Sequence, residues 1–254
     1  MRVTGRRPHT VRWDDVAGHR IRSLHTGGNR AGGHEVVVLP GLGALGYLTD
    51  TLEGCGAWAD SFLLDVPGFG HRPPRACPAR IPALADAVSA WLAAVPRGPV
   101  VLVGHSTGAQ VALRVAADHP DRVRTLVLMG PTFPPALRRA SGLLRALPRT
   151  LVHESAKRTR RHRALLRPRR DARPAAVRAL GTARLARADH LPGDLPHAGP
   201  AGPRHDALAP GEWALRLAAT APRGRSMTVP GAHNFPYLHG GLTAALIAEA
   251  ARYR

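Results

Sequence analysis

The stretch Val100-Val-Leu-Val-Gly-His-Ser-Thr-Gly108 joins a short apolar run to a Gly-x-Ser-x-Gly sequence. The run has the length and β-branched content of a buried strand, and the alanine-rich residues 109–117 after it are typical of a helix. Two glycines allow a sharp turn between such a strand and helix, with Ser106 on the turn and its hydroxyl exposed. Because this context is present, the sequence predicts a nucleophilic serine rather than an ordinary glycine-rich turn.

Apolar runs of the same kind recur on both sides of this stretch. Each is short, and Gly or Pro soon follows it, which is typical of strands in a buried parallel sheet. His19–His25 alternates more weakly, as an antiparallel edge strand would. Helical patterns lie between the runs, so the sequence predicts an α/β fold with a mostly parallel sheet and helices on both faces. The other predicted strands are Glu35–Leu39, Ser61–Leu64, Val123–Met129 and Ser226–Val229, and the predicted helices are Ile81–Val95, Thr107–His119, Glu212–Ala219 and Leu242–Arg252.

Positive charge is concentrated in one segment of the chain. The 254 residues carry a formal net charge of +19, and arginine supplies all but one of the 36 basic residues, a bias typical of GC-rich genomes. Between Arg138 and Arg187, 16 basic residues stand against two acidic ones. The alternation of strands and helices breaks over Phe133–His190. We therefore expect a helical, Arg-rich insert in residues 133–190 and the α/β core in residues 1–132 and 191–254.

The composition argues against a nucleic-acid-binding, a membrane-spanning or a secreted protein. We expect the basic insert to be a solvated face, with an anionic substrate or an acidic partner as the alternative. Aromatic residues make up only 4% of the chain and no recognition motif is present, so we do not expect a nucleic-acid partner. No apolar run approaches the ~18 residues of a transmembrane helix, and no signal peptide is evident. Cys55 and Cys77 are expected to be free thiols of a cytoplasmic protein. The sequence does not indicate an oligomeric state.

Over most of its length, the chain resembles the α/β-hydrolase superfamily of serine hydrolases. Leu39-Pro-Gly-Leu-Gly43 is similar to the family's oxyanion loop, in which histidine often stands at the place of Pro40. Asp65-Val-Pro-Gly-Phe-Gly70 resembles its D-x-P-G-x-G segment, whose aspartate is usually structural. Gly130-Pro-Thr132 and Val229-Pro-Gly-Ala-His233 also match. The resemblance implies the α/β-hydrolase fold, with the basic insert forming a cap over the pocket.

The resemblance also implies which histidine serves the nucleophile. A serine hydroxyl reacts poorly at neutral pH and needs a base to take its proton. His233 is the candidate, because the family keeps its histidine at this place after the last strand. His239 is the nearby alternative. His105, beside Ser106 in sequence, is expected to be a packing or pocket residue.

The oxyanion donors and the acid complete the candidate site. By resemblance, the backbone N–H groups of Leu42 and Thr107 would form the oxyanion hole. Gly202-Pro-Arg-His-Asp-Ala-Leu-Ala-Pro210 is similar to the family's G-x-x-D-x-x-x-P loop, although one extra residue precedes the aspartate. This loop and the order Ser, Asp, His nominate Asp206, with Asp194 as the alternative.

The residues before the nominated acid do not have the pattern of the strand that delivers it in the family. Leu195–Arg204 contains three prolines and two glycines, and each proline removes a hydrogen-bond donor from a ladder. We therefore hold two hypotheses, neither of which implies a metal or organic cofactor. In the first, a serine hydrolase cleaves a carboxylic ester, lactone or thioester through an acyl-enzyme on Ser106. In the second, a catalytically impaired hydrolase-fold protein binds an acidic partner through its basic cap.

Overall fold

The computed structural model describes residues 8–27, 33–41, 45–68, 75–132, 182–183, 206, 208–221, 223–229 and 233–252. The predicted cap in residues 133–190 lies outside this set except for Thr182–Ala183, so the expected domain division stays a prediction. The described elements are the strands β1 (Thr10–Val16), β2 (His19–Thr26), β3 (Glu35–Leu39), β4 (Asp60–Leu64), β5 (Val100–His105), β6 (Val123–Met129) and β7 (Thr182–Ala183), the helices α1 (Thr49–Gly56), α2 (Ile81–Ala94), α3 (Thr107–Asp118), α5 (Gly211–Ala219), α6 (Phe235–Leu238) and α7 (Gly240–Arg252), and the 3₁₀ turns η1 (Gly46–Leu48) and η2 (Pro120–Arg122).

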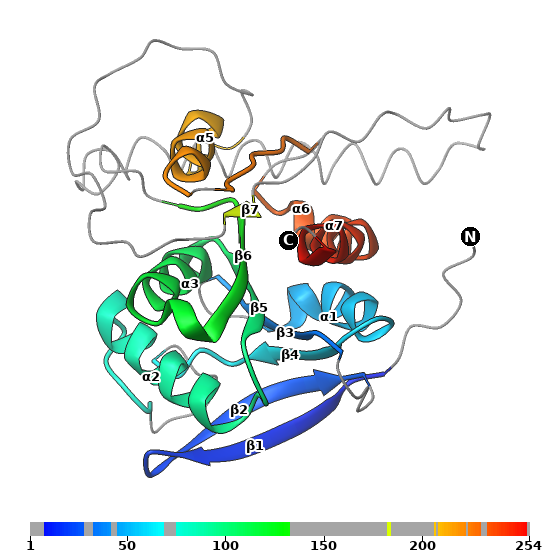
Figure 1. Ribbon diagram of the computed structural model, residues 1–254. Helices are drawn as coiled ribbons and strands as arrows, with labels where there is room; N and C mark the ends of the chain where they lie inside the picture. Colours follow the sequence, from blue (N-terminus) through cyan, green and yellow to red (C-terminus); the bar gives the residue numbers. More distant parts are fainter. Residues whose placement is uncertain are drawn as a thin grey trace.

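The described strands form one seven-stranded sheet in the order β1-β2-β4-β3-β5-β6-β7 (Figure 1). Strands β4, β3, β5 and β6 are parallel to one another, whereas β1, β2 and β7 are antiparallel to their neighbours. The predicted α/β class is therefore confirmed. The sequence missed β1, so β2 is not the edge strand that His19–His25 was expected to form. The β1–β2 turn places Ala17 and Gly18 at positive φ, as a two-residue hairpin turn requires.

Helices cover both faces of the sheet and bury an apolar core on each. Helices α2 and α3 lie together on one face, and α1 and α7 lie together on the other (Figure 1). Successive residues of a strand point to opposite faces, so a strand buried on both sides is apolar along its length, as β3 is after its first residue, Glu35. The first core contains Val37, Leu39, Phe62, Leu64, Leu84, Val88, Trp91, Leu102, Val111, Val115, Leu126 and Leu128. The second contains Val36, Val38, Leu52, Leu63, Val101, Val103, Val127, Met129, Ala244 and Ile247.

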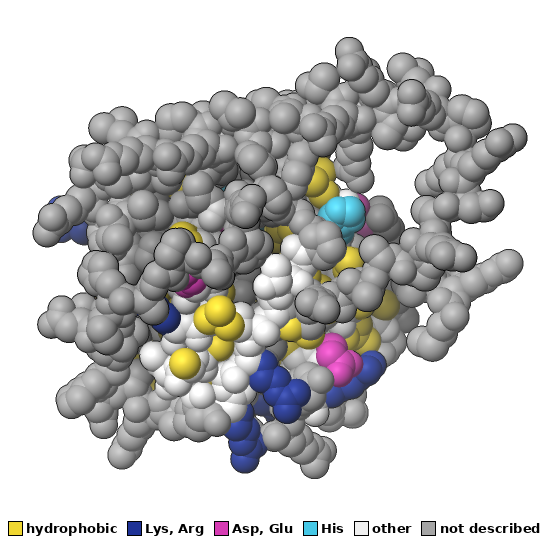
Figure 2. All heavy atoms as spheres, turned by 90° about the horizontal axis from the view of Figure 1, so that it is seen from above, with side chains coloured by type: hydrophobic (Ala, Val, Ile, Leu, Met, Phe, Trp, Pro, Cys, Tyr) yellow, Lys and Arg dark blue, Asp and Glu magenta, His cyan; other side chains and the backbone are white. Residues whose placement is uncertain are grey.

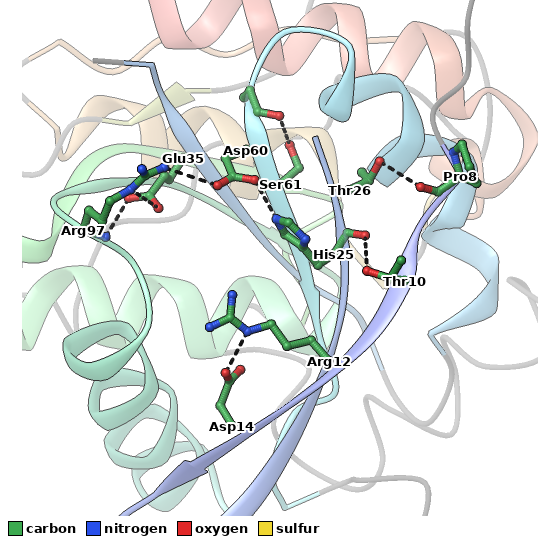
Figure 3. Close-up of polar contacts among 11 residues, drawn as sticks. Pro8, Thr10, Arg12, Asp14, His25, Thr26, Glu35, Asp60, Ser61 and Arg97 are labelled. Atoms are coloured by element: carbon green, nitrogen blue, oxygen red, sulfur yellow. Dashed lines mark hydrogen bonds and ion pairs between the residues drawn. The ribbon is translucent and has the colours of Figure 1, made fainter. Parts of the chain in front are cut away.

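Polar contacts tie the strands together where the parallel strands begin (Figure 3). Nε2 of His25 on β2 lies 2.6 Å from Oδ1 of Asp60 at the start of β4. The guanidinium of Arg97, in the loop before β5, contacts Asp60 at 3.3 Å, and the Arg97 backbone N–H donates to Glu35 of β3. At the other end of β4, Asp65 accepts two hydrogen bonds from Arg22 of β2. This arrangement gives Asp65 a structural contact, in line with the expectation for its motif.

One predicted strand, which was expected after β6 in the chain, is not formed in the structure. Ser226–Val229 was predicted to be a strand, but it forms no regular strand in the structure. Together with the end of β6 it lines a cavity of about 130 Å³. A strand needs a neighbour for its ladder, and among the described residues β6 pairs on this side only with the two residues of β7.

Within the described part of the chain, no helix is both long enough and apolar enough to cross a bilayer.

Candidate active site

Ser106 lies on the turn between β5 and α3 with an unusual backbone conformation. Its φ of 56° and ψ of −122° fall in a region that residues with a side chain rarely adopt. Such a conformation costs on the order of 1–3 kcal/mol and persists only where the surrounding structure enforces it. The Ser106 N–H donates to the Met129 carbonyl of β6 at 3.0 Å, which anchors the turn to the neighbouring strand.

The two glycines of the motif allow this turn because a side chain at either would collide with backbone. A Cβ added at Gly104 would lie 2.5 Å from the Gly108 carbonyl oxygen and 2.6 Å from Cα of Ala109. One added at Gly108 would lie 2.4 Å from the carbonyl oxygen of Leu39 at the end of β3. The helix therefore packs directly against the strands. This contact explains why the motif requires glycine at both positions.

The structure brings three of the predicted residues into one hydrogen-bonded series. Nε2 of His233 lies 2.9 Å from Oγ of Ser106. On the other side of the same ring, Nδ1 lies 2.9 Å from Oδ2 of Asp206. A carboxylate can only accept, so Nδ1 carries the proton and Nε2 is free to accept the serine O–H. The arrangement can remove a proton from Ser106 and stabilise the imidazolium that results.

Asp206 is held by the residues that follow it. Its Oδ1 accepts the backbone N–H groups of Leu208 at 3.1 Å and Ala209 at 3.0 Å. An aspartate that accepts from the backbone two and three residues ahead fixes its own turn. The second oxygen of the carboxylate remains available for His233. Asp194, the alternative acid, lies outside the described residues.

Gly130, directly after β6, is a site residue whose role the sequence analysis did not identify. It has a φ of 49°. A Cβ at this position would lie 3.1 Å from Nδ1 of His233 and 3.4 Å from Oδ2 of Asp206. The glycine thus leaves room for the hydrogen bond between the histidine and the acid. The Gly-Pro-Thr match contained the signal, because a glycine directly after a buried strand often marks a close approach.

The buried His105 and the partly buried Tyr47 form a second hydrogen-bonded group beside the nucleophile. Nδ1 of His105 lies 2.7 Å from the Tyr47 hydroxyl, and Nε2 lies 2.9 Å from the carbonyl oxygen of His233. Burial, followed by the nearby charge of His233, lowers the pKa of His105 to about 3, while burial raises the pKa of Tyr47 to about 12. His105 was expected to be a packing or pocket residue, and its ring contacts Tyr47 and a backbone carbonyl. Tyr47 was not identified from sequence.

The remaining predicted residues are placed only in part. Leu42 lies outside the described residues. Thr107 is the first residue of α3 and is buried, and the N–H groups of a first helical turn have no acceptor within the helix. The ring of His239, the alternative base, packs against Phe235 with 5.1 Å between ring centroids. The Ser106 hydroxyl is instead contacted by His233.

The chain matches known proteins over part of its length. The model of the family described as alpha/beta hydrolase fold matches residues 36–182. A dihydrolipoyllysine-residue acetyltransferase component of the acetoin cleaving system of Cupriavidus necator is 32% identical over 120 residues, which cover 46% of this chain and 31% of that protein. Lipase LipV of Mycobacterium tuberculosis is 48% identical over 67 residues, 26% of this chain and 25% of that protein. A pimeloyl-(acyl-carrier protein) methyl ester esterase of Neisseria meningitidis is 40% identical over 96 residues, 37% of this chain and 35% of that protein. The matches thus span about a third or less of the relatives' own length.

Proposed function

The chain belongs to the α/β-hydrolase fold family, and from this premise we propose that it is a serine hydrolase that cleaves a carboxylic ester, lactone or thioester through an acyl-enzyme on Ser106. The observation that carries the proposal is the series Ser106–His233–Asp206, in which both hydrogen bonds measure 2.9 Å. The relatives named as a lipase and as a methyl ester esterase support this substrate class.

Acylation begins with proton removal from the serine. Nε2 of His233 takes the hydroxyl proton as Oγ of Ser106 attacks the acyl carbon, and Asp206 stabilises the imidazolium. The carbonyl oxygen becomes an oxyanion that needs preorganised N–H donors. The Thr107 amide is one candidate, and Leu42 remains the predicted second. His233 then returns the proton to the leaving alcohol or thiol, whose bond to the acyl carbon breaks.

Deacylation repeats the same steps with water. His233 removes a proton from a water molecule, and the resulting hydroxide attacks the acyl carbon of the ester on Ser106. When the bond to Oγ breaks, the proton passes from Nε2 to the serine, and the carboxylic acid leaves. The enzyme returns to its starting state, so one water is consumed for each ester cleaved.

The position of Asp206 supports this proposal over a catalytically impaired protein. That alternative depended on the proline- and glycine-rich run before the acid, which is poorly suited to form the strand that delivers it. The carboxylate nevertheless lies at hydrogen-bonding distance from His233 and is held by the turn after it. The basic cap, through which an acidic partner would bind, lies outside the described residues.

A fluorophosphonate probe tests the proposal, because it reacts with activated serines. The full chain should be labelled on the peptide that contains Ser106, and Ser106→Ala should not be labelled. His239→Ala serves as the control, since it removes the alternative base and should leave labelling intact. A wild-type protein that the probe does not label, or a Ser106→Ala variant labelled equally well, would contradict the proposal.

A further inference from the structure

Three hydrogen bonds in series connect the loop after β3 to the histidine of the candidate site. The backbone N–H of Gly41 donates to the Tyr47 hydroxyl at 2.6 Å. The Tyr47 hydroxyl contacts Nδ1 of His105 at 2.7 Å, and Nε2 of His105 contacts the His233 carbonyl oxygen at 2.9 Å. The mechanism described above uses neither side chain.

Chemistry fixes the direction of every bond in this series. A carbonyl oxygen only accepts, so Nε2 of His105 must carry a proton and donate it to His233. The ring is neutral over the physiological range, because its pKa is lowered to about 3. Nδ1 therefore has a lone pair and accepts the hydrogen bond that the Tyr47 hydroxyl donates. The Tyr47 oxygen in turn accepts the N–H of Gly41.

The series joins segments that meet at the nucleophile. Gly41 lies against Ser106, since a Cβ added to the glycine would be 2.9 Å from Cβ and 3.3 Å from Oγ of the serine. His105 directly precedes the serine on β5. His233 contacts the serine through its ring and His105 through its backbone carbonyl. The two hydrogen-bonded side chains therefore link Gly41 to the backbone of His233, and both of these residues lie against Ser106.

We propose that Tyr47 and His105 are positioning residues that hold Gly41 and the backbone of His233 at fixed places against Ser106. The inference rests on the proposed function for its kinetic consequence. Neither side chain is assigned a contact with substrate. Each acts through a backbone group, and the series occupies the Gly41 N–H, so that amide is not an oxyanion donor.

Two substitutions remove the hydrogen bonds at the two ends of the series separately. Tyr47→Phe keeps the ring but leaves the Gly41 N–H without its acceptor and Nδ1 of His105 without its donor. His105→Asn can still accept from Tyr47 with an oxygen near the place of Nδ1, but it is too short to reach the His233 carbonyl. Ser61→Ala is the matched control, because it also removes one buried hydroxyl, which donates to the Ala59 carbonyl near the start of β4 (Figure 3).

The first readout is the rate at which a fluorophosphonate modifies Ser106 in the full chain. A misplacement of 1 Å costs about 100-fold in rate, so shifts of a fraction of an ångström should slow each single variant on the order of tenfold. Because the two residues belong to one series, Tyr47→Phe/His105→Asn should be slowed little more than the slower single variant. Ser61→Ala should react at the wild-type rate. Single variants that react at the wild-type rate, or losses that multiply in the double variant, would overturn the proposal.

The second readout does not depend on activity. Nitrogen-15 NMR of the imidazoles should show His105 neutral, with its proton on Nε2, down to about pH 4. In Tyr47→Phe the Gly41 amide should exchange with solvent faster than in the wild type, whereas Ser61→Ala should leave it protected. A proton on Nδ1 of His105 in the wild type, or unchanged exchange at Gly41, would refute the series itself. If the wild type is not labelled at Ser106, the proposed function fails, and this readout alone decides for or against the hydrogen-bonded series.

Discussion

Replacing Gly130 by alanine should reduce both stability and activity, and the loss of activity should be specific to this position. The substitution puts a side chain on a residue with a φ of 49°, which costs about 1 kcal/mol of unfolding free energy. The new Cβ would lie 3.1 Å from Nδ1 of His233, whereas non-bonded heavy atoms prefer about 3.5–4.0 Å. The ring must therefore move by roughly 0.4 Å, and we expect turnover to fall roughly tenfold, by the scale on which 1 Å costs about 100-fold.

Gly18→Ala is the matched control for this experiment. Gly18, in the β1–β2 turn, also has a positive φ of 78°, but no heavy atom lies within 4 Å of the position of an added Cβ. Both variants should thus lose about 1 kcal/mol in urea unfolding. Only Gly130→Ala should lose turnover on an activated ester such as p-nitrophenyl acetate. If the two variants turn over this ester equally fast, the argument that Gly130 makes room for the pair of His233 and Asp206 is wrong.

Three further predictions concern the acid, the buried histidine and the polar contacts far from the nucleophile. Asp206→Asn should lower turnover about 10³- to 10⁴-fold with folding intact, because the amide favours the wrong histidine tautomer. Steady-state kinetics on one ester should show this loss for Asp206→Asn and not for Asp194→Asn, and the opposite result would mean that the acid is wrongly assigned. The pKa of His105 is lowered to about 3, so below pH ~6.5 the unfolded chain binds a proton that the native state does not. The free energy of unfolding should therefore decrease as the pH is lowered, by up to about 1.4 kcal/mol per pH unit. Urea unfolding should therefore show the stability difference between wild type and His105→Asn narrowing by about 2 kcal/mol from pH 6.5 to pH 5, and a constant difference would contradict the shift. Arg97→Ala should cost less than about 1 kcal/mol, since its side chain is 55% exposed, and should leave ester turnover unchanged.

The central strands were predictable because burial on both faces makes their pattern explicit. The predicted bounds of β3 and β6 agree with the structure, and those of β4 and β5 differ by one or two residues. In contrast, β1 is polar along most of its length and exposed at five of its seven residues. Its strand conformation depends on pairing with β2, and a single sequence carries little signal for such a partner.

The residues around Ser106 were predictable to different degrees for a similar reason. Ser106 lies in a local motif whose form reflects a tight turn, and His233 ends a local motif, Val229-Pro-Gly-Ala-His233. Asp206 was in doubt because the residues before it cannot form a good strand, yet its carboxylate accepts two backbone N–H groups from the residues after it. Its place is thus set by a local turn. The pairing of Tyr47 with His105 spans 58 positions of the chain, and nothing in the sequence around either residue indicates the other.

The strained backbone of Ser106 lowers the thermal stability of the protein at the same residue that carries the proposed nucleophile. Its φ of 56° and ψ of −122° are easily reached by glycine alone, and the strain is on the order of 1–3 kcal/mol. Selection for heat resistance alone would therefore favour Ser106→Gly, a variant that keeps the turn and loses the hydroxyl. Directed evolution toward a more heat-stable form of this protein should be screened for turnover at every round, because one stabilising substitution removes the proposed nucleophile.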